Sequence, residues 1–153
     1  MSVSACSVGA VGLGATLVAV GALVLSPTHP DPTALWTHAE PALDALTRVG
    51  VPASVIRLGV FGFACNIVMF VPLGFFGALL LPRPRWWAAA LACLVLTCAI
   101  ETTQGLLLPG RTFDVKDIIG NAAGGLLGAA AAFALRSLSA AISGGASRVA
   151  PAR

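Results

Sequence analysis

The chain has 153 residues, of which 58% are hydrophobic and only 10% are charged, and its mean hydropathy is +0.93. These values lie outside the range of a soluble protein, so the length predicts a single domain that is integral to a membrane. The formal charge of +3 comes from basic residues scattered singly between apolar runs. This pattern is typical of residues that set membrane topology, and it argues against binding to nucleic acid.

The cysteines lie in or beside apolar runs, at Cys6, Cys65, Cys93 and Cys98. They form no CxxC pair, and no histidine stands at ligand spacing from them, so neither a zinc site nor a disulfide framework is indicated. We therefore expect no metal and no cofactor. The N-terminus lacks the basic region of a secretory signal, so we expect the first apolar run to be retained, with a cleaved signal as the alternative.

Four apolar runs are long enough for membrane-spanning helices, which need ~20 mostly apolar residues. They cover about residues 8–25, 58–81, 86–108 and 118–135. The sequence thus predicts an all-α fold, an integral membrane bundle of four transmembrane helices within one domain (1–140), with three helices as the alternative. The remaining Ala-, Ser- and Gly-rich segment, 141–153, is predicted to be a flexible cytoplasmic tail.

The connections between these runs carry turn and capping signals. In the long first connection, Leu43, Leu46 and Val49 recur at helical spacing until Gly50, which predicts a short helix lying at the membrane interface. In the third connection, Asp114 or Asp117 can cap the helix that follows.

Topology is predicted from the basic residues. The tight second connection contains Arg83 and Arg85 and is followed by two tryptophans. Basic residues favour the cytoplasmic side of a membrane. The chain is therefore expected to be a multi-pass membrane protein with both termini in the cytoplasm.

Polar residues gather at the opposite end of the predicted bundle. With a rise of 1.5 Å per residue, Asn66, Glu101 and Asn121 lie ~12, ~10 and ~5 Å below the outer surface, so three helices bring polar groups to a similar depth. A charged acid there costs on the order of 3 kcal/mol or more, so Glu101 should be protonated or face a polar partner. The candidate ligand-binding residues are Asn66, Glu101, Gln104, Arg111, Lys116, Asp117 and Asn121.

Gly120, Gly124 and Gly128 form a double small-xxx-small pattern in the fourth run. Such a stripe lets a neighbouring helix approach closely. We expect the third and fourth helices to pack through it, against the face of the third helix that carries Glu101. Pro72, inside the second run, is expected to bend its helix.

These residues resemble the VanZ-like family of small bacterial membrane proteins. The resemblance rests on two blocks that together span Asn66 to Gly128, the first being NIVMFVPLGF. In the second block the family's polar and glycine positions are matched by Glu101, Gln104, Arg111, Asp114, Asp117, Asn121, Gly124 and Gly128. The resemblance implies an association with glycopeptide (teicoplanin-type) antibiotic resistance, without implying a mechanism.

The leading functional hypothesis is a cell-envelope protein with a polar cleft in the outer leaflet that binds a membrane lipid or a lipid-linked, amphiphilic glycan. Arg111 and Lys116 would hold a phosphate or carboxylate headgroup. A second hypothesis is a membrane-embedded hydrolase or transferase using Glu101 with Asp114 or Asp117. A third is a proton-coupled carrier, which would require a homo-oligomer because four short helices form no path alone. Alternatively, the polar side chains have only a structural role and form hydrogen bonds that hold the helices together.

Overall fold

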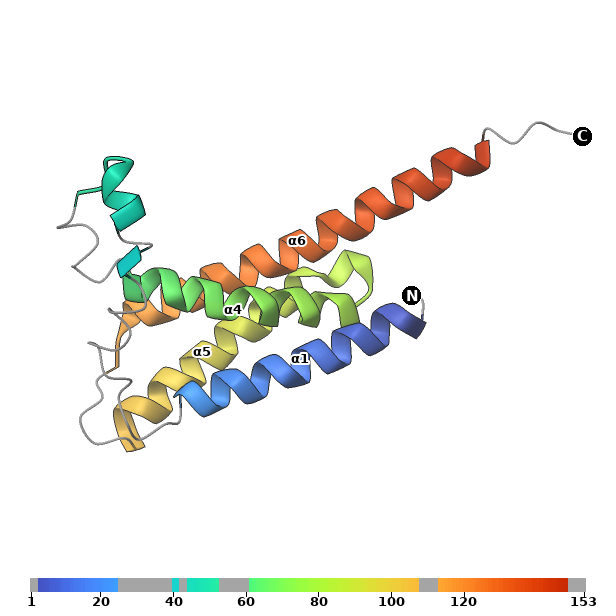
Figure 1. Ribbon diagram of the computed structural model, residues 1–153. Coiled ribbons are helices and arrows are strands. Elements are labelled where there is room, and N and C mark those ends of the chain that lie inside the picture. The colour runs from blue at the N-terminus through green and yellow to red at the C-terminus, as the bar shows by residue number, and fades with distance from the viewer. Residues whose placement is uncertain (1–2, 25–39, 42–43, 53–60, 108–112, 149–153) are drawn as a thin grey trace, which may run out of the picture.

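The computed structural model describes residues 3–24, 40–41, 44–52, 61–107 and 113–148. It contains four helices that are long and apolar enough to cross a membrane, and the described residues contain no strand (Figure 1). The predicted all-α bundle of four transmembrane helices is confirmed. The helices are α1 (Val3–Val24), α4 (Phe61–Leu80), α5 (Trp87–Leu107) and α6 (Val115–Arg148).

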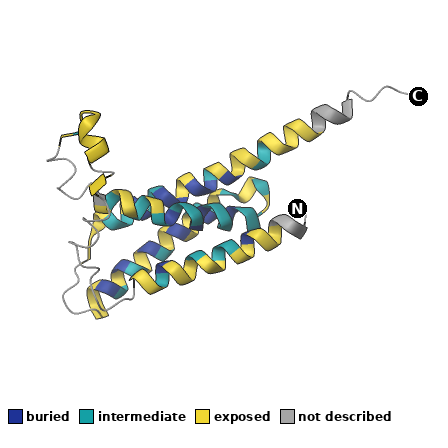
Figure 2. Ribbon diagram, in the orientation of Figure 1, coloured by how far each residue is buried: buried dark blue, intermediate teal, exposed yellow. Residues whose placement is uncertain are grey.

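Helix α4 is the centre of the bundle, because it packs against α1, α5 and α6, and its contact with α6 is the most extensive of all. Buried side chains concentrate where α4, α5 and α6 meet, whereas most of α1 and the C-terminal part of α6 are exposed (Figure 2). Phe70 and Leu73 of α4 form the core with Cys93 of α5, and Val20 and Val24 of α1 close it. The exposed surface remains largely apolar, as a lipid-facing surface must be.

The glycine stripe of α6 faces α4, so our expectation that it packs against α5 is wrong. A Cβ atom built on Gly124 would collide with the carbonyl oxygen of Ile67, and one built on Gly128 with that of Val71. Helix α4 contributes a glycine of its own, since a Cβ on Gly74 would meet the carbonyl oxygen of Gly125. These small residues let the two backbones lie almost in contact.

Helix α5 meets α6 on a neighbouring face. There the side chain of Cys93 packs against Gly125, where a Cβ would collide with it, and Thr97 contacts Asn121 one helical turn earlier on α6. One turn of α6 thus presents glycines to α4 and a polar side chain to α5. The spacing of the glycines predicted a close approach correctly but could not specify which neighbouring helix makes it.

Helix α6 is much longer than the predicted 118–135. Its 34 residues give a length of roughly 50 Å, against roughly 30 Å for α1, α4 and α5, and its C-terminal part extends beyond the bundle (Figure 1). Residues 136–148 are rich in Ala and Ser and contain no proline, and the helix continues through Gly144 and Gly145. The hydroxyls of Ser139 and Ser143 donate to the backbone carbonyls four residues earlier. The expected tail at 141–153 is therefore helical as far as Arg148.

The short helix predicted in the first connection is present at residues 44–48, where every side chain is exposed. Gly50 follows it with φ of +93°, a left-handed conformation that glycine adopts without strain. Its N–H donates to the carbonyl of Thr47, and the N–H of Val51 donates to that of Leu46. This pair of bonds is the Schellman motif that ends helices. The interfacial location of the helix remains a prediction.

Candidate functional site

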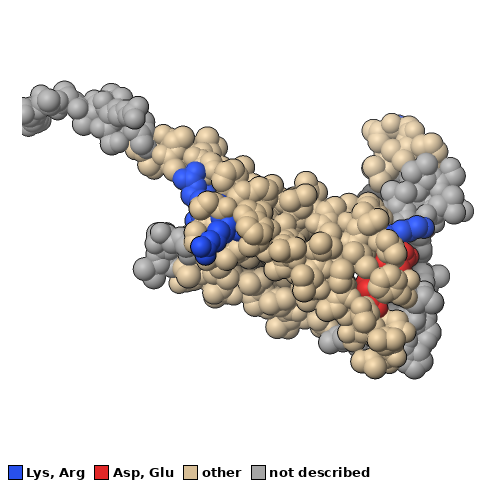
Figure 3. All heavy atoms as spheres, turned by 180° about the vertical axis from the view of Figure 1, so that it is seen from behind, with Lys and Arg blue, Asp and Glu red and all other residues tan. Residues whose placement is uncertain are grey.

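Charged side chains are segregated to the two ends of the bundle (Figure 3). The acidic side chains of Glu101, Asp114 and Asp117 lie at the end where α5 finishes and α6 begins. Arg83, Arg85 and the C-terminal half of α6 lie at the opposite end. We refer to the first as the acidic end and to the second as the arginine end.

Asp114 caps the N-terminus of helix α6, as predicted. The side chain of Glu101 in turn forms a hydrogen bond with the backbone of Asp114. A side-chain oxygen of Asp114 accepts a 2.8 Å bond from the N–H of Lys116, which satisfies one of the free donors of the first turn. The N–H of Asp114 in turn donates to Oε2 of Glu101 at 3.0 Å. Glu101 is only 2% exposed, so its carboxyl group lies inside the protein, at the point where α5 and α6 come together.

Asn66 and Asp117 connect α4 to the first turn of α6. Nδ2 of Asn66 donates to Oδ1 of Asp117 at 2.6 Å. Asp117 also complements the positive end of the α6 dipole, because it lies in the first helical turn. The sequence placed Asn66 at the depth of the other polar groups, and this bond joins it to them.

Asn121 lies one turn deeper, in the interior between α5 and α6. Its Nδ2 donates to the hydroxyl oxygen of Thr97 at 2.9 Å, and the two residues are 3% and 0% exposed. Oδ1 of Asn121 is buried and has no hydrogen-bond partner among the described residues. A buried hydrogen-bond acceptor without a donor destabilises a protein. A water molecule or a ligand that donates a hydrogen bond to this oxygen would therefore bind favourably.

Gln104 joins the acidic end to α1. It is 5% exposed, and its Nε2 donates to the carbonyl oxygen of Val24, the last residue of α1, at 3.3 Å. The amide therefore satisfies one of the free carbonyls at a helix C-terminus. With Gln104, all four transmembrane helices contribute to the polar layer at the acidic end.

The structure brings most of the predicted site residues together. Asn66, Glu101, Gln104, Asp117 and Asn121 all take part in bonds between helices or to the start of α6. The backbone of Lys116 belongs to the cap and its side chain is exposed, whereas Arg111 lies outside the described residues.

Thr97 precedes Glu101 by one helical turn and was predicted to share a helix face with Glu101 and Gln104, but it was not among the candidate ligand-binding residues. That spacing, on the same helical face, could have identified it as a partner in the polar layer.

The donor set of this layer is made of amides, hydroxyls and carboxyls. Among the described residues, no group of three or more His, Cys, Asp or Glu side chains could hold a metal ion. The four cysteines are free thiols, and only Cys93 is buried. The arrangement can accept and donate hydrogen bonds to a polar group that enters from the acidic end.

A comparison with known protein families identifies the family of this chain. The family model described as VanZ/LLP1 matches residues 15–136, which is most of the chain. The chain belongs to the VanZ/LLP1 family. The VanZ match is wider than the two blocks from Asn66 to Gly128, because it includes much of α1 and the beginning of the C-terminal half of α6. Neither the search of curated proteins nor that of solved structures found a match.

Proposed function

We propose that this VanZ-family protein lies in the bacterial cell membrane with its acidic end in the outer leaflet, where it binds the headgroup of a lipid-linked or amphiphilic glycan. We further propose that this binding is linked to resistance to teicoplanin-type glycopeptides. The observation that carries the proposal is the buried polar layer of Thr97, Glu101, Gln104 and Asn121 at one end of an otherwise apolar bundle. Both termini would then lie in the cytoplasm.

The chemistry of the layer favours a ligand rich in hydroxyl or amide groups. The unpartnered Oδ1 of Asn121 requires a donor, which a sugar hydroxyl or an N-acetyl amide supplies. In this arrangement Arg111 and Lys116 contact the phosphate of the lipid carrier, with Arg making the bidentate contact. The apolar surface between the helices takes the hydrocarbon tail.

The bonds of the carboxyl groups favour binding over catalysis. A hydrolase or transferase would require Glu101 and either Asp114 or Asp117 to face a substrate together. Asp114 instead caps α6, and Asp117 accepts a bond from Asn66. A proton-coupled carrier using Glu101 would require several copies of the chain, and no feature of the bundle favours that function over binding.

The decisive experiment compares Glu101→Gln with the wild-type protein in a teicoplanin-susceptible Gram-positive host. Glutamine keeps the shape of the side chain and an oxygen that can accept from the N–H of Asp114, but it cannot ionise. We expect wild-type expression to raise the inhibitory concentration of teicoplanin and Glu101→Gln to abolish the increase at unchanged membrane abundance.

The matched control is Thr102→Val, the exposed neighbour of Glu101, whose hydroxyl bonds only to its own helix. This variant should behave as wild type. Full resistance in Glu101→Gln at normal abundance would remove Glu101 from the binding site. An unchanged inhibitory concentration with the wild-type protein would refute the link to resistance.

A further inference from the structure

The arginine end of the bundle carries positive charge that no described carboxyl group neutralises. Arg83 and Arg85 lie on the 3-10 helix η2 (Arg83–Arg85), which connects α4 to α5, and Arg136 lies on α6. A group of basic side chains lies at one end of the molecular surface, and the acidic side chains lie at the other end, beside a further basic side chain (Figure 3). Of the described acidic residues, Glu101, Asp114 and Asp117 lie at the other end of the bundle, where α5 finishes and α6 begins.

Arg136 is held against the connection between α4 and α5. Its Nη1 donates to the carbonyl oxygen of Ala78 in the last turn of α4 at 3.0 Å and to that of Leu81, just after α4, at 2.8 Å. Leu81 is two residues before Arg83, so the guanidinium of Arg136 lies close to the start of η2. Three arginines from two distant parts of the sequence are therefore brought together by the fold.

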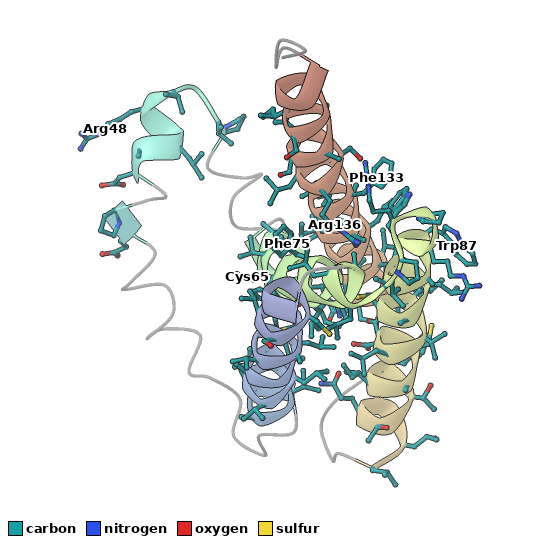
Figure 4. The ribbon with its side chains drawn as sticks, turned by 90° about the vertical axis from the view of Figure 1, so that its right-hand side faces the viewer. Arg48, Cys65, Phe75, Trp87, Phe133 and Arg136 are labelled. Atoms are coloured by element: carbon teal, nitrogen blue, oxygen red, sulfur yellow. The ribbon has the colours of Figure 1, made fainter. Side chains whose placement is uncertain are left out.

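Aromatic contacts fix the connection in this position. Trp86 stacks on Phe133 of α6, with ring centroids 5.5 Å apart and an interplanar angle of 29°. Phe133 precedes Arg136 by three residues, and both project from α6 towards the beginning of α5, where Trp87 lies (Figure 4). Trp86 is thus used for packing, whereas Trp87 is 54% exposed.

An apolar stripe leads from this connection along the outside of α5. Trp87, Leu91 and Val95 recur at intervals of four residues, so they share one face of the helix. They are 54%, 50% and 62% exposed, and no other part of the described chain covers them. The stripe begins two residues after Arg85 and lies on the face of α5 opposite the buried residues Ala89 and Cys93.

We propose that Arg83, Arg85, Arg136 and Trp87 form a binding site for the phosphate headgroup of an anionic phospholipid, with an acyl chain lying on the stripe Trp87, Leu91 and Val95. Arginine suits a phosphate because its planar fork donates two parallel hydrogen bonds. Tryptophan prefers the headgroup level, and basic surfaces between helices bind anionic headgroups there. This site is distinct from the acidic end, and it does not depend on the ligand proposed there.

The position of the arginines distinguishes a lipid from a soluble anion. Helices α4 and α5 both cross the membrane, so the short connection between them lies at the headgroup level. A soluble anion would contact only the arginines and not the apolar stripe. A phospholipid would contact the arginines through its headgroup and the stripe through an acyl chain.

Tryptophan fluorescence with brominated lipids tests the proposal. The full chain with Trp36→Phe retains only Trp86 and Trp87, both beside the site. It is reconstituted into phosphatidylcholine vesicles that contain increasing fractions of dibrominated phosphatidylglycerol or dibrominated phosphatidylcholine. We expect the anionic lipid to bind roughly five-fold more tightly or better, as expected from surface arginines near anionic lipid. Equal quenching by the two lipids overturns the proposal.

Arg83→Ala/Arg85→Ala should bring the ratio of the two affinities close to one while quenching by dibrominated phosphatidylcholine, which reports insertion, stays the same. The matched control is Arg48→Glu, on the exposed turn at residues 44–48, because it changes the net charge by the same two units. It should keep the wild-type preference. If both variants lost the preference for the anionic lipid equally, the total charge of the protein and not this site would select the lipid, and the proposal would be overturned.

A final arm separates a lipid from free phosphate. Potassium phosphate is added to the vesicles and compared with potassium chloride at the same ionic strength, so that screening is identical. We expect the two salts to weaken the preference for phosphatidylglycerol equally. Selective displacement by phosphate would identify a site for a soluble anion and overturn the lipid assignment. If the double variant fails to insert, Arg85→Ala alone is measured, since its exposed side chain makes no described bond to the protein.

Discussion

The amide of Asn121 donates to the hydroxyl of Thr97 at 2.9 Å, and the two buried side chains form a polar bridge between α5 and α6. One turn nearer the membrane surface, Glu101 of α5 accepts from the backbone of Asp114 just before α6. The two helices are thus joined by polar bonds at two successive turns. This relationship makes α5 and α6 the rigid part of the acidic end.

A double-mutant cycle should measure the Thr97–Asn121 bond. Thr97→Val and Asn121→Leu each break it, and the double variant removes both polar groups. Hydrogen bonds between transmembrane helices couple by about 0.6 kcal/mol on average and up to about 1.7 kcal/mol, and we expect a value in this range. The free energy of unfolding in a denaturing-detergent titration provides the measurement. Additive effects would show that the bond contributes no net stability.

The contact between α4 and α6 should be more sensitive than that bond. Gly124→Ala places a methyl group against the carbonyl of Ile67, so the helices must separate. Overpacking of this kind costs typically 1–3 kcal/mol, measured by the same titration. The control is Gly62→Ala on α4, where a Cβ has open space and where alanine improves helix propensity by up to about 1 kcal/mol. Equal destabilisation by both substitutions would contradict the close approach.

Much of this fold was predictable because the membrane restricts the alternatives. Backbone groups in lipid must be satisfied internally, so each apolar run of sufficient length becomes a helix, and the four runs were located within a few residues at most ends. The C-terminal end of α6 was missed because the predicted span stopped at Leu135, before Arg136 and the serines that follow it. The continuation to Arg148 depends instead on the helix propensity of alanine and the absence of proline.

The sequence identified the helices that contribute to the polar layer but not how their side chains pair. Helical rise alone placed Asn66, Glu101 and Asn121 near one level, and the structure joins all three to neighbouring elements. The choice of partners depends on how each helix is rotated about its axis, which the glycine contacts between α4 and α6 determine. Sequence periodicity defines a face of a helix but does not say which neighbour it meets, so the glycine stripe was assigned to the wrong helix.

Arg136 should stabilise the arginine end as a cap of α4. Arg136→Gln removes the charge that complements the helix C-terminus and weakens the two bonds to Ala78 and Leu81. Hydrogen bonds to charged groups contribute about 1.5–3 kcal/mol, so we expect a destabilisation of this order in detergent, where no anionic lipid is present. Arg85→Ala, an exposed arginine of the same end, should change stability little. If Arg136→Gln and Arg85→Ala lowered the stability by a similar amount, the effect would be due to the loss of charge and not to the loss of the cap.

The orientation of the bundle is open to a direct chemical test. The connection at Arg83 and Arg85, with Arg136 beside it, has no described acid near it, and basic residues favour the cytoplasm. Two exposed positions report the two ends without altering any charge. They are Val115 at the start of α6 and Pro84 within η2. Each is changed to cysteine in a variant in which the four native cysteines are replaced by alanine.

In intact cells, an impermeant maleimide should label Val115→Cys, because the proposed orientation places the acidic end outside the cell. Pro84→Cys should react only after the membrane is permeabilised. The cysteine-free parent gives the background, and labelling of both variants after permeabilisation shows that both thiols are accessible. Labelling of Pro84→Cys alone in intact cells would reverse the orientation. The polar layer of Glu101 and Asn121 would then face the cytoplasm, where it could not reach a ligand in the outer leaflet.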